Sequence, residues 1–164
     1  MNYIIFVIFL ILGITFRVVP HPPNFTPILS IALLSGYYIK NRYSILLPIA
    51  IMLFSDIALG GNPMGYWVYI SITLIILLGY FIKNNAKNII LNSFLSSLLF
   101  FLITNFGVWA TGGYSYTLYG LIECYALAIP FFKNTLMSTV FFSMSIYCLH
   151  YFINPVLLKY QENV

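Results

Sequence analysis

The sequence is poor in charged residues, and this shortage excludes most classes of soluble protein. Only 6% of its 164 residues are charged, with three acidic and seven basic side chains. A soluble domain of this length needs a charged surface, and so few side chains cannot cover one. The net charge of +4 therefore gives no indication of nucleic-acid binding, and its meaning lies in where the basic residues fall.

Catalytic and cofactor-binding motifs are also missing. The chain has no HExxH, CxxC, Walker A or glycine-rich dinucleotide loop, and its Ser, His and Asp residues follow no catalytic order. Its two cysteines, Cys124 and Cys148, would lie about 36 Å apart along one helix, which excludes a disulfide. We therefore expect no enzymatic activity, no metal site and no cofactor.

Apolar residues are abundant instead, at 62% of the chain. Their runs recur along all 164 residues, which is typical of an integral membrane protein. The composition predicts an all-α fold, a polytopic helix bundle in which residues 1–164 form a single transmembrane domain. Its expected partner is the lipid bilayer, and no nucleic acid is expected.

Six apolar segments predict six transmembrane helices. They cover about 2–16, 25–39, 44–59, 65–82, 88–110 and 117–153, the last with a kink at Pro130. The first segment lacks the basic start and the cleavage site of a signal peptide, so we expect it to be retained. A hydrocarbon core of about 30 Å needs about 20 helical residues, so the second and third segments are short.

The basic residues predict the orientation. With six spans, five basic residues face the cytoplasm and two, Arg17 and Lys133, lie outside, as the positive-inside rule prefers. This predicts a multi-pass protein of the bacterial inner (plasma) membrane with both termini in the cytoplasm. A seven-span alternative, split at Lys133, gives the same charge ratio. The geometry favours six spans. FFKNT would give two packed antiparallel helices only a minimal turn, whereas a proline kink within one long helix is ordinary.

Unusual polar residues gather on the predicted outer side, beginning with the stretch RVVPHPPNFTPI at residues 17–28. Prolines withdraw N–H groups and hold the chain extended, and short flanking helices place this stretch near or below the outer surface. Non-helical backbone at that depth is tolerated where protein covers it or where it lines a watery cavity. The stretch is either a rigid turn with one snorkelling arginine or part of a cavity wall.

Charged residues inside the apolar segments predict ion pairs. Asp56 and Glu123 are the only carboxylates outside the C-terminal tail. An ionised group in mid-membrane costs about 2.5–3.5 kcal/mol, so such groups pair, face a cavity, or both. Arg17 with Asp56, and Glu123 with Lys133, are candidate structural pairs, and Arg17 could also reach Glu123. Pairing and ligand binding are compatible.

Four segments carry a resemblance to a known family: RVVPHPPNFTPI, LLPIAIMLFSDIALG, FFLITNFGVWATGG and GLIECYALAIPFFKNTL. They resemble recurring segments of a family of uncharacterised bacterial integral membrane proteins, over nearly the whole chain. More distantly, the order of elements resembles the S components of energy-coupling-factor vitamin transporters. Those are six-helix proteins in which a loop after the first helix covers an outward pocket. The Ala-xxx-Ala pattern by which many S components dock on their partner is absent from the first helix here.

The resemblance implies that the chain binds and takes up a small vitamin-like or ring-containing nutrient from the outer side. It places Glu123 and Cys124 at the level of the ligand, and it implies energising transporter subunits as partners. We expect a lid carrying His21 and Asn24 over a pocket floored by four residues: Asn105, Trp109, Glu123 and Cys124. The alternative is an assembly or structural membrane protein whose outer polar cluster binds another protein's loop.

Overall fold

Six helices make up the described part of the chain, and no strand occurs there. A computed structural model describes residues 3–39, 43–61, 65–83 and 85–161, with side chains described from residue 9 to residue 152 of these ranges. The helices are α1 (Tyr3–Val18), α2 (Ile28–Ile39), α3 (Tyr43–Ala58), α4 (Gly65–Tyr80), α5 (Ala86–Ala110) and α6 (Leu118–Gln161). The all-α prediction is confirmed for these ranges, and each helix matches one predicted segment.

The last apolar segment is one helix. α6 has 44 residues and continues through both Pro130 and Lys133, so a seven-helix arrangement split at Lys133 is wrong. α5, with 25 residues, is the one described helix that is both long and apolar enough to cross a membrane. α1 to α4 are apolar but shorter. Six membrane spans therefore stay a prediction. The predicted distribution of basic residues between the two sides of the membrane also stays a prediction, since Lys40 and Arg42 lie outside the described residues.

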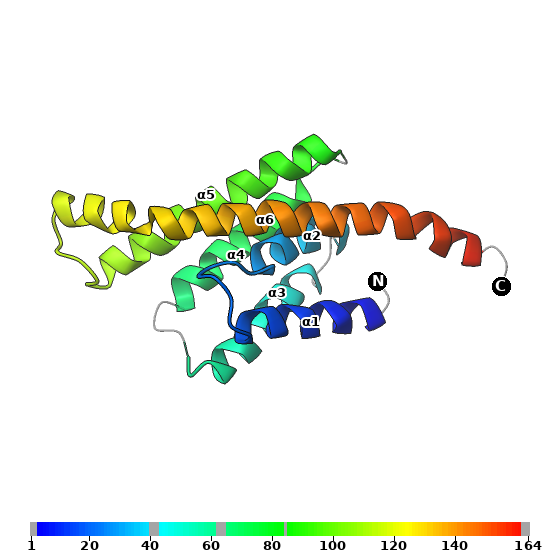
Figure 1. The fold of residues 1–164 in the computed structure, drawn as a ribbon, viewed down its shortest axis with the longest axis horizontal. Coiled ribbons are helices and arrows are strands. Elements are labelled where there is room, and N and C mark those ends of the chain that lie inside the picture. The colour runs from blue at the N-terminus through cyan, green and yellow to red at the C-terminus, as the bar shows by residue number, and fades with distance from the viewer. Residues whose placement is uncertain (1–2, 40–42, 62–64, 84, 162–164) are drawn as a thin grey trace.

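α2 lies at the centre of the bundle, where it contacts α3, α4, α5 and α6. Its residues 28–36 are all buried, because neighbours surround it on every side. α5 and α6 pack along each other, and α1 packs mainly on α3 (Figure 1). The two chain ends lie toward the same end of the molecule, whereas the connections after α1, α3 and α5 lie toward the other (Figure 1).

The bundle is apolar outside and carries hydroxyl groups inside. On α3, Leu53, Phe54 and Ile57 are 51%, 57% and 76% exposed. The buried polar side chains are almost all serine and threonine, and many donate to a carbonyl of their own helix, as Ser93 does to Ile89 at 2.8 Å. Water-soluble domains bury apolar side chains and keep hydroxyls near the surface. This bundle also buries apolar side chains, such as Leu33 and Ile75, but it differs in having an apolar outer face and many buried hydroxyls.

Two glycines allow α2 and α4 to cross closely. A Cβ atom added to Gly36 would lie 2.1 Å from the carbonyl oxygen of Ile76, and one added to Gly79 would lie 2.1 Å from that of Leu33. Both obstacles are backbone atoms, which cannot rotate away as a side chain can. The crossing therefore depends on the absence of both side chains.

We predict that Gly36→Ala and Gly79→Ala each destabilise the protein by about 1–3 kcal/mol, because α2 and α4 must separate. Gly65→Ala is the matched control, since its Cβ would meet only the Tyr69 side chain at 3.4 Å. Thermal unfolding in detergent measures the difference. Equal effects of Gly36→Ala and Gly65→Ala would show that the crossing tolerates a methyl group.

Candidate functional site

The proline-rich loop between α1 and α2 is fastened to α6. Asn134 donates from Nδ2 to the carbonyl oxygen of Pro23 at 3.0 Å, and Ser138 Oγ donates to that of Asn24 at 3.3 Å. Asn24 has a φ of 62°, a left-handed conformation that asparagine adopts more readily than most residues. Residues 19–27 therefore form a held segment with a defined turn at Asn24.

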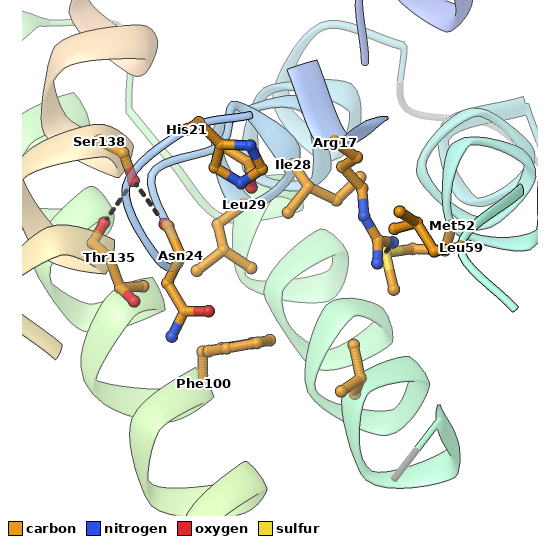
Figure 2. A pocket seen from close by; sticks show the side chains of 12 residues that line it. Arg17, His21, Asn24, Ile28, Leu29, Met52, Leu59, Phe100, Thr135 and Ser138 are labelled. Atoms are coloured by element: carbon orange, nitrogen blue, oxygen red, sulfur yellow. Dashed lines mark hydrogen bonds between the residues drawn. The ribbon is translucent and has the colours of Figure 1, made fainter. Parts of the chain in front are cut away.

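A partly open cavity of about 260 Å³ lies under this loop. All six described helices contribute side chains to its wall, together with the loop. Its lining combines apolar and polar side chains: Arg17, His21, Asn24, Thr26, Ile28, Leu29, Met52, Leu59, Val68, Phe100, Thr135 and Ser138. Figure 2 shows the side chain of Asn24 directed toward Phe100, with Leu29 and Ile28 between them and Arg17.

An ion pair lies beside the cavity, and its Arg17 side chain is part of the lining. Arg17 Nη2 lies 2.8 Å from Asp56 Oδ1, and the two side chains are 14% and 12% exposed. Tyr69 donates from Oη to the other carboxylate oxygen, Oδ2, at 3.0 Å. The Arg17 guanidinium also contacts the Met52 sulfur. Both oxygens of Asp56 thus have partners, and the charge of Arg17 is neutralised inside the bundle.

The His21 ring has a defined tautomer when it is neutral. Its Nδ1 lies 2.7 Å from the carbonyl oxygen of Val19. A carbonyl oxygen can only accept, so Nδ1 carries the proton and donates. The other nitrogen, Nε2, is then a hydrogen-bond acceptor at the edge of the cavity.

The structure separates the six residues that the sequence places in one ligand site. His21 and Asn24 line the cavity, whereas Asn105, Trp109, Glu123 and Cys124 do not. Cys124 Sγ donates to the Asn105 carbonyl at 3.3 Å between α5 and α6, and Trp109 Nε1 donates to the Ser115 carbonyl at 3.0 Å in the turn between them. The side chains of Cys124 and Trp109 thus hold the α5–α6 hairpin together, whereas Asn105 donates from Nδ2 to the Phe101 carbonyl of its own helix at 2.7 Å.

Glu123 is exposed on the same hairpin. It precedes Thr135, which lines the cavity, by about twelve residues, or about 18 Å along a helix. Neither Glu123 nor Lys133 takes part in an ion pair within the described ranges. The two residues lie on one helix about 15 Å apart, too far for a contact, so the expected pair between them does not form.

The sequence did not identify the cavity residues Thr26, Phe100, Thr135 and Ser138, nor Tyr69, which bonds to Asp56 outside the lining. Thr135 and Ser138 stand three residues apart in NTLMS, a spacing that puts two hydroxyls on one helix face, and this was the available signal. Phe100 and Tyr69 lie in apolar segments that give no such signal.

The fold and this cavity define an all-α, six-helix protein with a polar pocket under a proline-rich loop. The chain belongs to a family of unknown function, DUF6580, whose sequence profile matches residues 1–160. No curated protein and no solved structure matches the chain significantly.

We predict that the Arg17–Asp56 pair is strongly coupled. Arg17→Ala and Asp56→Ala should each destabilise the protein by about 3–5 kcal/mol, because each leaves a buried charge without its partner. The double variant should cost clearly less than the sum. Lys133→Ala is the control and should change the unfolding free energy by less than about 0.5 kcal/mol, since Lys133 is exposed. Additive single effects in thermal unfolding would contradict the coupling.

Proposed function

We propose that the protein is an integral membrane protein that binds a small ring-containing molecule from the outer side, as a step in its uptake. The observation that carries this proposal is the cavity beside the Arg17–Asp56 pair, covered by the loop at residues 19–27. Uptake, as opposed to binding alone, rests on the resemblance to S components and would need energising subunits.

The distribution of side chains supports a membrane location. Large apolar residues stand on the outer faces of several helices, as Ile57, Phe81 and Phe141 do at 76%, 83% and 59% exposed. Exposed to water they would promote aggregation, whereas in lipid they are stable. The short α2, with 12 residues, covers only about 18 Å of a core about 30 Å thick. The loop at residues 19–27 extends the chain through the remaining depth.

The position of the loop between α1 and α2 indicates which side of the membrane the cavity faces. The loop at residues 19–27 follows the end of α1, whose start lies toward the other end of the molecule, and Ser138 holds it near the middle of α6 (Figure 1). With cytoplasmic termini, as the basic residues indicate, the cavity faces the outside. A solute arriving from outside would therefore meet the loop first.

The size and lining of the cavity support a small polar ligand. Its volume of about 260 Å³ is slightly below the usual range of about 300–1,000 Å³ for ligand pockets, which limits the ligand to a small molecule. The lining offers amide, imidazole and hydroxyl groups beside Phe100 and Leu29, which could contact the face of a ring. An acyl chain would leave these polar groups unpaired, so a lipid ligand is disfavoured.

Ligand-induced stabilisation tests the proposal. The detergent-solubilised protein is heated with a panel of water-soluble vitamins and their ring precursors. A ligand present at about 100 times its dissociation constant should raise the unfolding free energy by about 2.7 kcal/mol. Phe100→Trp should abolish this effect by filling the cavity. Phe106→Trp, the same change at an exposed position of α5, should keep it.

Two results would count against the proposal. One is a panel in which no compound stabilises the wild-type protein, which is the result expected of an assembly protein. The other is a stabilising compound that acts equally on Phe100→Trp and Phe106→Trp, because its binding would then lie outside the cavity.

A further inference from the structure

The cavity has no net charge to offer a ligand. Arg17, the one arginine or lysine in the lining, is paired with Asp56 at 2.8 Å, and Tyr69 donates to the second carboxylate oxygen at 3.0 Å. An anionic ligand would have to compete with Asp56 for the guanidinium. A cationic ligand would have to draw Asp56 away from Arg17 and Tyr69. Either exchange leaves a charge unpaired in a poorly hydrated site, which is unfavourable.

Asn24 provides an amide that the protein does not use. Its backbone carbonyl accepts from Ser138, but its side-chain amide has no hydrogen-bond partner within the described ranges. This amide projects into the cavity toward Phe100 (Figure 2). A primary amide donates and accepts side by side, which matches another amide in a two-point contact.

Other polar groups of the lining are less available. The hydroxyl protons of Thr135 and Ser138 are directed to backbone carbonyls. Thr135 donates to Phe131 at 2.9 Å, and the single Ser138 proton is shared between the carbonyls of Thr135 at 3.0 Å and Asn24 at 3.3 Å. His21 contributes Nε2 as an acceptor, because its Nδ1 donates to Val19. An N–H group on the ligand would therefore find acceptors in both Asn24 Oδ1 and His21 Nε2.

We propose that the cavity selects an uncharged ring compound bearing a carboxamide or a ring lactam, with Asn24 as the residue that determines this specificity. The ligand carbonyl accepts from Asn24 Nδ2 while its N–H donates to Asn24 Oδ1 or His21 Nε2. The ring lies against Phe100 and Leu29. This inference rests on the proposed function and adds the substrate class.

Three compounds of equal shape test the selectivity. Benzamide is neutral, benzoate is its anionic counterpart and benzamidinium its cationic one. The full chain in detergent is heated with each compound at the same millimolar concentration. Benzamide should raise the melting temperature, and the two ions should bind at least about 10-fold more weakly, since each loses one hydrogen bond and adds an uncompensated charge.

Substitutions at Asn24 distinguish the role of its side-chain amide in binding from the role of its backbone conformation in the loop. Asn24→Gly retains the left-handed conformation, so the unliganded protein should melt near the wild-type temperature, but the benzamide shift should be lost. Asn24→Asp also tolerates this conformation and replaces the amide with a carboxylate. This variant should prefer benzamidinium to benzamide.

The inference is overturned if benzoate or benzamidinium stabilises the wild-type protein as much as benzamide, if Asn24→Gly keeps the benzamide shift, or if none of the three compounds has an effect. Its failure differs from that of the proposed function. A charged vitamin that binds in a Phe100-dependent way would overturn only the substrate class. A panel without any binder would overturn the binding function itself.

Discussion

The ion pair between Arg17 and Asp56 joins α1 to α3, and the Tyr69 hydroxyl ties α4 to the same carboxylate. In a poorly hydrated interior neither charge is stable alone, so each requires the other in place. α1 packs mainly on α3, and the pair lies at the end of α1 from which the proline-rich loop begins. The ion pair fixes the point at which the loop begins, and the hydrogen bonds from Asn134 and Ser138 then hold it over the cavity.

Composition and charge predicted the architecture well, because they reflect constraints that act on whole segments. Each apolar run forms one helix. The FFKNT sequence is part of α6, as expected because it is too short for a comfortable turn between two packed helices. The candidate pair of Arg17 and Asp56 also followed from a general cost, that of leaving a charge unpaired in an apolar bundle. Neither inference required knowledge of how the helices pack.

The site was only partly predictable, because the residues that line it depend on how far neighbouring helices are shifted along their axes. A six-span topology diagram places Glu123, Cys124 and His21 on the same side of the membrane. α6 has 44 residues, however, so its first turns extend well beyond the level of Thr135, which is where the loop is held. Helix length and packing register, which a list of apolar segments does not contain, decide which side chains meet.

Cysteine labelling in intact cells tests most directly whether this bundle lies in a membrane with its cavity facing out. In a Cys148→Ser background, where the remaining Cys124 is only 2% exposed, Thr26→Cys reports on the cavity and Lys83→Cys on the connection between α4 and α5. A membrane-impermeant maleimide should label Thr26→Cys in intact cells and Lys83→Cys only after permeabilisation. Labelling of Lys83→Cys in intact cells, or no labelling of Thr26→Cys there, would contradict the account.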